Sequence, residues 1–199
     1  MTTAEAGYDL VLVGTSWGGL AVLRALVTAL PLSLCMGVVL VQHRHRDSDH
    51  LLRTLLQEGT ELPVEEIEDK MALEQGRIYV APPNYHTLIE PGHFSLSTEA
   101  PVRHSRPSID VTFHSAADSY GARTVGVVLT GANDDGSDGL RRIVERGGLA
   151  LVQDPATAES PTMPAAAIRA VPEARVMPLR DLVNFVASLP AGTPAREGR

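Results

Sequence analysis

The sequence has few residues that could staple a fold covalently or hold a metal through sulfur. Cysteine occurs once among 199 residues, at Cys35, which excludes an internal disulfide framework and a multi-cysteine zinc site. A chain of this length buries about 70% of the surface that its unfolded form exposes, so it needs no such staples. We expect one domain of ordinary size in a cytoplasmic protein; the single cysteine fits a reducing compartment and also fits a secreted chain.

Positive charge is also scarce. Lysine and arginine number 17 against 24 aspartates and glutamates, which gives a formal net charge of −7. Nucleic-acid binding depends on clustered lysine and arginine, so we expect no nucleic-acid partner. The one dense basic segment, residues 43–46, is followed at once by Asp47 and Asp49.

Long apolar segments are missing as well. No run approaches the roughly 20 residues that a helix needs to span a bilayer. Residues 1–7 have neither the basic region nor the apolar centre of a signal peptide. We therefore expect no membrane insertion and no secretory leader.

The apolar residues that are present form short runs with two kinds of spacing. Residues 8–13 and 36–41 are continuous, β-branched runs, which are typical of strands buried on both faces. Residues 20–30 have helical spacing and end at Pro31. Further strands are predicted at 63–67, 77–80, 124–129, 149–153 and 175–177, and further helices at 48–58, 109–120, 139–146, 164–171 and 182–189.

Strands that alternate with helices in this way predict an α/β fold. We expect a doubly wound three-layer sandwich with a mostly parallel sheet. Residues 85–90 and 93–97 flank a Pro-Gly pair, which adds an antiparallel hairpin. No linker separates two domains, so residues 1–190 are predicted to form one domain and residues 191–199 a flexible tail.

Polar residues follow three of the predicted buried strands, where ligands bind in sheets of this kind. Ser16 lies in a glycine-rich turn after the first strand, and His43 follows the second. Asp134 and Asp135 come after the strand at 124–129. A serine, a histidine and an aspartate are the parts of a hydrolytic triad, whatever their distances along the chain.

Each of these residues also has a structural interpretation. Ser16 is a candidate nucleophile because a sharp turn exposes its hydroxyl, but serine at this position is equally typical of a helix N-cap. Spacing does not choose between Asp134 and Asp135, and either is acceptable in a turn. Asp138 is interpreted as a helix N-cap, and the histidines other than His43 as hydrogen-bonded or exposed residues.

Two other kinds of site are disfavoured. The glycines of residues 14–19 lack both the following lysine of a P-loop and the Gly-x-Gly-x-x-Gly spacing, which argues against a nucleotide cofactor. Residues 43–50 contain histidines and aspartates without metal-ligand spacing and among arginines, which argues against a metal. We expect neither a cofactor nor a metal.

Taken together, the motifs are similar to those of one known family. The sequence resembles the catalytic domain of the chemotaxis protein-glutamate methylesterases of the CheB type, with the motifs in family order over roughly residues 8–189. They are the Gly-Thr-Ser-x-Gly-Gly turn at 14–19, Gln42-His43, the Tyr-x-Ala-Pro-x-x-x-His segment at 79–86, Arg-Pro-Ser-x-Asp at 106–110, and Leu-Thr-Gly…Asp-Gly at 129–136.

The resemblance implies a serine hydrolase that removes methyl esters from glutamate side chains of chemoreceptors, and that also deamidates receptor glutamines in many members. It implies Ser16 as nucleophile, His43 as base and Asp135 as the orienting carboxylate. The N–H groups of Trp17 and Ala132 become candidates for the oxyanion hole. Another candidate residue, Arg106, is expected to line the cleft.

The resemblance also implies partners. The methylated cytoplasmic helices of a chemoreceptor would be the substrate. The family's receiver domain has no counterpart before the catalytic sequence, which begins within the first ten residues, so control by a separate receiver-domain protein is expected.

The sequence departs from the family pattern around the candidate site. Arg44-His45 replaces Met-Pro, Ala132 replaces methionine, and Trp17 stands where threonine is usual. These changes keep two alternatives open, a non-catalytic CheB-like binding or scaffold protein and an esterase for another substrate. Arg44 and Arg46 also suggest contact with an acidic helix.

Overall fold

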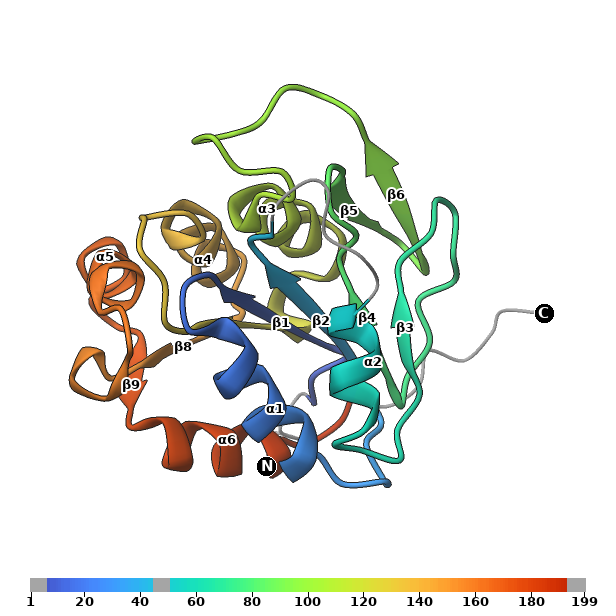
Figure 1. Ribbon diagram of the computed structural model, residues 1–199, viewed down its shortest axis with the longest axis horizontal. Coiled ribbons are helices and arrows are strands. Elements are labelled where there is room, and N and C mark those ends of the chain that lie inside the picture. Colours follow the sequence, from blue (N-terminus) through green and yellow to red (C-terminus); the bar gives the residue numbers. More distant parts are fainter. Residues whose placement is uncertain (1–6, 45–50, 193–199) are drawn as a thin grey trace, which may run out of the picture.

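The computed structural model describes residues 7–44 and 51–192. At its centre is a seven-stranded sheet in the order β3-β4-β2-β1-β7-β8-β9, and every adjacent pair is parallel (Figure 1). Its strands are β1 (Leu10–Thr15), β2 (Gly37–Gln42), β3 (Val64–Glu66), β4 (Arg77–Val80), β7 (Thr124–Val128), β8 (Leu149–Gln153) and β9 (Arg175–Met177). The predicted α/β class with a mostly parallel sheet is confirmed.

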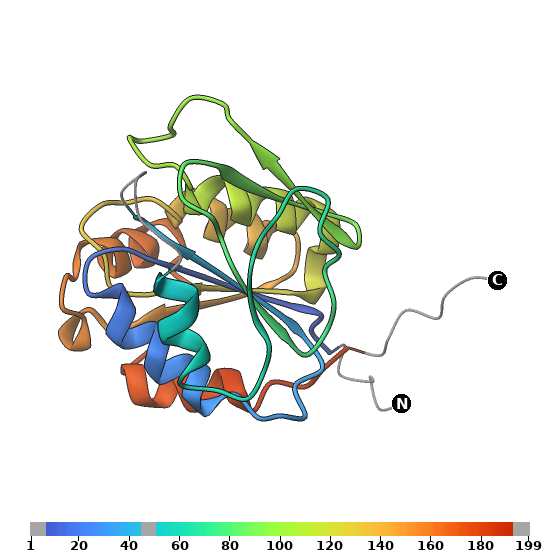
Figure 2. The same ribbon diagram turned by 45° about the vertical axis from the view of Figure 1, so that its right-hand side comes forward.

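Helices cover both faces of the sheet and make the three layers of the sandwich (Figure 2). One face packs against α1 (Gly19–Ala29), α2 (Leu51–Gln57) and α6 (Leu179–Ala187). The other packs against α3 (Ile109–Tyr120), α4 (Ser137–Glu145) and α5 (Thr162–Ala170). Two short 3₁₀ turns, η1 (Gly121–Arg123) and η2 (Pro155–Thr157), join neighbouring elements.

The continuous apolar run of β1 follows from this layering. Successive side chains of a strand point to opposite faces. Val11 and Val13 enter the core beneath α1, whereas Leu10 and Leu12 enter the core beneath α3, and all four are fully buried. A strand with two covered faces has no polar side, so its sequence does not alternate.

The predicted hairpin is present as a separate antiparallel pair, β5 (His86–Glu90) and β6 (His93–Ser97). It is fixed to α3 by side-chain hydrogen bonds. The N–H of Ile89 donates to Ser115 Oγ at 2.9 Å, and Ser119 Oγ donates to the Ile89 carbonyl at 2.8 Å. The chain then runs from β6 to the start of α3, whose first turn belongs to the candidate site.

One predicted helix cap is wrong. The N-cap of α4 is Gly136, with φ of 92°, and Asp138 lies inside the first turn. Glycine takes this left-handed conformation without the steric cost that a side chain adds. The helix therefore starts at Ser137, before the predicted position 139, and similar shifts move the starts of α5 and α6 earlier than predicted.

The two ends of the described chain meet. Ala191 forms a parallel bridge with Tyr8, and the N–H of Gly192 donates to the Tyr8 carbonyl at 2.8 Å. The rest of the predicted tail, 193–199, and residues 48–50 of the predicted second helix lie outside the described residues. Across the part that is described, no helix has the length and apolarity needed to cross a bilayer.

Candidate active site

The candidate site lies where the winding of the sheet changes direction. Strand β1 stands between β2 and β7: the chain leaves β1 toward β2 on one side and later continues with β7 on the other. The carboxyl ends of these three strands are adjacent, and backbone bonds join them: the N–H of Ser16 donates to the Thr130 carbonyl at 3.0 Å and that of His43 to the Thr15 carbonyl at 3.1 Å. This is the position at which open α/β sheets bind ligands.

Ser16 lies in the turn between β1 and α1 and does not cap the helix. The N-cap is Gly18, with φ of 77°, and no side chain bonds to the first turn. The N-cap interpretation of Ser16 is therefore wrong. The residue before Ser16 anchors the turn to the end of β7, because Thr15 Oγ1 donates to the Thr130 carbonyl at 2.8 Å.

The structure distinguishes between the two candidate aspartates. Asp135 is fully buried, and its Oδ2 lies 2.7 Å from His43 Nε2. Asp134 has a side chain that is 61% exposed and pairs with Arg103 Nη1 at 2.7 Å. Only Asp135 contacts the histidine, as the resemblance implies.

The first turn of α3 surrounds the Asp135 carboxylate with donors. Apart from His43, the donors are Ser108 Oγ at 2.9 Å and the N–H groups of Ile109 at 2.8 Å, Asp110 at 3.0 Å and Gly136 at 3.1 Å. Burial by itself raises the pKa of this carboxyl, but the bonds from His43, Asp110 and Ile109 outweigh it and lower the pKa below its ordinary value. The carboxylate is thus held ionised by hydrogen bonds from the protein.

A second buried carboxylate stands behind the first. Asp110 Oδ1 accepts a hydrogen bond from the N–H of Gly139 at 2.7 Å, which joins the first turn of α3 to that of α4. Burial raises the pKa of Asp110 to about 6, against the bond from Gly139, and the negative charge of Asp135 adds to the rise. Asp110 therefore changes its protonation state near pH 6, within the helix turn that holds Asp135.

The contact with Asp135 also assigns the two ring nitrogens of His43. An ionised carboxylate only accepts, so the proton on this side belongs to Nε2. Nδ1 is then the basic nitrogen, and Asn133 Nδ2 lies 3.5 Å from it. The side chains of Ser16 and His43 make no hydrogen bond to each other in the described structure, and such contacts are often long before substrate binds.

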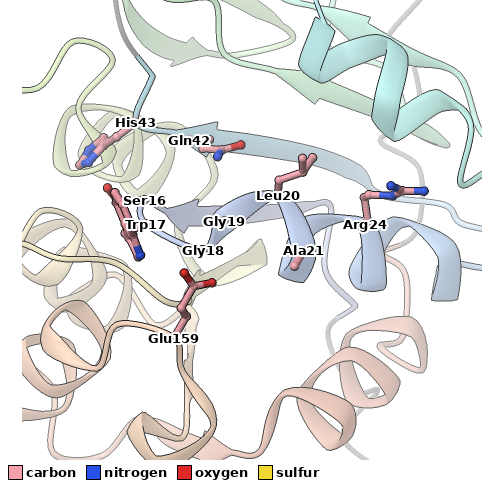
Figure 3. Close-up of a pocket in the computed structure, with 10 residues that line it drawn as sticks. All are labelled: Ser16, Trp17, Gly18, Gly19, Leu20, Ala21, Arg24, Gln42, His43 and Glu159. Atoms are coloured by element: carbon pink, nitrogen blue, oxygen red, sulfur yellow. The ribbon is translucent and has the colours of Figure 1, made fainter.

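Two clefts meet at His43. The larger has a volume of about 640 Å³ and extends along α1 (Figure 3). The residues that line it include Ser16, Trp17, Gly18, Leu20, Arg24, Gln42, His43 and Glu159. The smaller, of about 420 Å³, lies beyond the histidine and is lined among others by Arg44, Asn84, His104 and Arg106. Ser16 thus opens onto a cleft wide enough for a side chain from another molecule.

The remaining candidate residues occupy different parts of these clefts. The backbone N–H groups of Trp17 and Ala132 find no acceptor among the described residues. Arg106 lines the smaller cleft, but its Nη1 donates to the carbonyls of Thr98 and Glu99 at 2.8 and 2.9 Å, so it holds the loop before α3.

The side chain of Arg44 is largely buried against the rest of the protein. Its side chain is 8% exposed, its Nη2 donates to the Ala81 carbonyl at 2.8 Å, and it lies 3.5 Å from Glu66. Arg46, the other arginine suggested for an acidic partner, lies outside the described residues. Among the residues that are described, no group of three or more histidine, cysteine, aspartate or glutamate side chains is placed to hold a metal.

Sequence reasoning missed three residues of the site. Ser108 entered the sequence analysis only as part of the Arg-Pro-Ser-x-Asp motif, yet its hydroxyl donates to Asp135. Asn133 and Glu159 carried no signal, because both lie in irregular loops without periodicity. Their place depends on how the ends of β7 and β8 meet the turn after β1.

A parallel α/β sheet that presents a serine and a histidine paired with a buried aspartate at its switch point has the arrangement found in serine hydrolases. Comparison with known proteins gives the family. The family model described as CheB methylesterase matches residues 11–186. The chain belongs to the CheB methylesterase family.

Similar proteins include both short and long relatives. A Leptospira interrogans protein, provisionally named protein-glutamate methylesterase/protein-glutamine glutaminase, is 41% identical over 92% of this chain and 95% of its own length. A Moorella thermoacetica protein with the same two activities in its name is 38% identical, and the chain spans 45% of its length. The crystal structure of the Thermotoga maritima CheB methylesterase catalytic domain has a TM-score of 0.85 at 28% identity, covering 90% of this chain and all of that one.

Proposed function

We propose that the protein hydrolyses methyl esters on glutamate side chains of chemoreceptors and deamidates glutamine side chains at the same site. The observation that carries the proposal is the hydrogen bond between His43 and the buried Asp135, beside Ser16 in an open cleft. The relatives named for both activities support the substrate class. An ester and an amide each place a carbonyl carbon before a small leaving group, so one serine can attack either.

The first half of the reaction forms an acyl-enzyme. Ser16 Oγ attacks the ester carbonyl while His43 Nδ1 takes the hydroxyl proton. Asp135 stabilises the imidazolium that results. The N–H groups of Trp17 and Ala132 receive the oxyanion, which requires donors that are not already occupied. The proton then passes from His43 to the methoxide oxygen, and methanol leaves.

The second half of the reaction hydrolyses the acyl-enzyme and regenerates the free enzyme. Water attacks the acyl carbon and gives a proton to His43 Nδ1, the Ser16–acyl bond breaks, and the hydroxyl regains its proton. The product is a glutamic acid side chain, which releases its proton to solvent, so each turnover adds one negative charge to the substrate protein. With glutamine, ammonia replaces methanol as the leaving group.

The substrate partner is proposed to be the cytoplasmic helices of a methylated chemoreceptor. A cleft that is open to solvent accepts a side chain from the surface of a folded helix, whereas an enclosed pocket would require a free small molecule. Control by a separate receiver-domain protein stays a prediction.

Methanol release from membranes that carry methylated chemoreceptors tests the proposal. We expect release by the wild type, loss of at least a thousandfold in Ser16→Ala, and no change in Ser33→Ala, which removes an exposed hydroxyl elsewhere. A fluorophosphonate that labels only an activated serine completes the test. Labelling of Ser16 without methanol release would indicate another ester, and absence of both would indicate a scaffold protein.

A further inference from the structure

The larger cleft contains a carboxylate with no partner of its own. Glu159 lines the cleft together with Ser16 and Trp17. Over residues 7–44 and 51–192, its side chain makes no hydrogen bond or ion pair with another residue. Figure 3 shows the carboxylate directed from the loop after β8 toward the turn at Gly18.

The loop that carries Glu159 is fastened to the nucleophile turn. The N–H of the next residue, Ser160, donates to Thr130 Oγ1 at 2.9 Å. The same hydroxyl donates to the Trp17 carbonyl at 3.0 Å. Gly131 N–H donates to the Ser160 carbonyl at 3.1 Å. One threonine thus couples the position of the Glu159 backbone to that of Trp17.

The side chain of Glu159 also packs against the turn directly. A Cβ atom added to Gly18 would lie 2.6 Å from Glu159 Oε2. Gly18 is two residues from Ser16, so the carboxylate lies on the order of 10 Å or less from the reacting hydroxyl. Glu159 is exposed in the cleft, and a carboxylate at that distance affects what the cleft accepts.

The other charges around the cleft do not cancel this one. Arg24 also lines it, but Figure 3 shows its guanidinium at the far end, directed away from Ser16. The N-terminus of α1 carries a partial positive charge, which by itself would attract anions to the turn. A full negative charge on Glu159 opposes that attraction.

We propose that Glu159 is a specificity-determining residue that disfavours anionic groups in the cleft. An ester flanked by neutral or basic residues is preferred over one flanked by acidic residues, and the carboxylate product binds less well than the ester. This inference rests on the proposed function, because it names the charge of the segment that the same site accepts.

The weaker binding of the product follows from the charge that the reaction creates. Hydrolysis replaces a neutral methyl ester by a carboxylate next to Ser16, within the field of Glu159. Repulsion between two such charges across a partly solvated cleft weakens binding several-fold and falls as salt screens it. Glu159 therefore contributes to product release while leaving the neutral ester unaffected.

The test uses peptides with one glutamate methyl ester that differ only in the flanking residues, glutamine or glutamate. We expect wild-type kcat/KM to favour the neutral flank, and the preference to fall roughly five- to tenfold in Glu159→Gln. Glu173→Gln, which removes an exposed carboxylate before β9, is the matched control and should keep the preference. In 0.5 M salt the difference between Glu159→Gln and the wild type should shrink.

Binding provides a readout that does not depend on turnover. Trp17 is the single tryptophan of the sequence and lines the cleft, so its fluorescence reports occupancy. In the Ser16→Ala background, we expect ester peptide to bind more tightly than its carboxylate product, and Glu159→Gln to reduce that difference roughly five- to tenfold.

The outcomes separate the two proposals. Equal preferences in wild type and Glu159→Gln, by both readouts, would overturn the role of Glu159 even if the peptides are hydrolysed. Discrimination in binding without hydrolysis would support it and contradict the proposed esterase. A role of Glu159 only in stabilising α1 would change the urea midpoint and leave both preferences intact.

Discussion

His43 Nε2 lies 2.7 Å from Oδ2 of Asp135, and the Asp135 side chain is fully buried while that of His43 is 12% exposed. The carboxylate thus meets the imidazole on the side away from solvent. Because the first turn of α3 supplies the remaining donors, the orientation of the histidine depends on a helix that follows it by more than 60 residues.

Replacing Asp135 by asparagine should abolish most activity. The amide is of similar size, but its NH₂ group faces donors and no longer fixes the proton on His43 Nε2. We expect kcat to fall roughly 10³- to 10⁴-fold, measured by methanol release. Asp134→Asn is the matched control, because that exposed side chain pairs with Arg103, and its kcat should stay within about twofold of wild type. Similar losses in both variants would contradict the assignment of Asp135.

Ser108→Ala should impair both stability and turnover. The hydroxyl donates to Asp135 Oδ1 and accepts from the N–H of Val111, so it orients the carboxylate and caps α3. We expect a loss of about 1–2 kcal/mol in the free energy of unfolding and a fall of roughly tenfold in kcat with little change in KM. A stability loss with unchanged kcat would show that the hydroxyl serves only as a helix cap.

Asp110 should make the stability depend on pH between about 4 and 6. Burial raises its pKa to about 6, so the folded protein keeps a proton that the unfolded chain releases. The stabilising contribution of this group is present at pH 4 and is lost as the pH rises through 6.

Asp110→Asn isolates this effect, because the amide oxygen still accepts from Gly139 and does not titrate. The free energy of unfolding of the variant minus that of the wild type should be larger at pH 8 than at pH 4.5. The change in this difference should be on the order of 2 kcal/mol, measured by urea unfolding. Asp181→Asn, at an exposed position in α6, is the control and should show no such dependence. The same difference at both pH values would contradict a raised pKa.

The sequence predicted the strands better than the loops between them. Buried strands such as residues 10–15 have two covered faces, and this leaves a continuous apolar run that is visible without a structure. Ser16 and His43 became candidates because each directly follows such a strand, and Asp135 because it lies in the loop after another one, β7. The choice of Asp135 over Asp134 came from the family resemblance, and the hydrogen bond to His43 now supports it.

Helix starts and loop residues were harder to predict, because tertiary contacts decide them. Asp138 has the chemistry of an N-cap, but Gly136 takes that position with a positive φ, and a Cβ there would lie 2.7 Å from Ile109 Cγ2. Glu159 shows no pattern at all. Its place in the cleft depends on Thr130, which is 29 residues earlier in the chain.

Gly18→Ala should cost more than its backbone conformation alone explains. The residue has φ of 77°, which disfavours any side chain, and a Cβ would lie 2.6 Å from Glu159 Oε2 and 2.9 Å from its Cβ. Gly92→Ala is the control, because Gly92 has φ of 79° and open space around its Cβ position. It should lose about 1 kcal/mol of unfolding free energy from backbone strain.

For Gly18→Ala we expect about 1–2 kcal/mol beyond that control, because Glu159 must move. The double variant with Glu159→Ala should regain part of the extra loss, as coupled residues do. A side chain pushed out of the cleft would also change the preference for neutral flanks in the direction of Glu159→Gln. Equal losses of unfolding free energy in Gly18→Ala and Gly92→Ala would mean that the Glu159 side chain moves aside at no cost. A side chain that moves so easily does not hold its charge in place near Ser16.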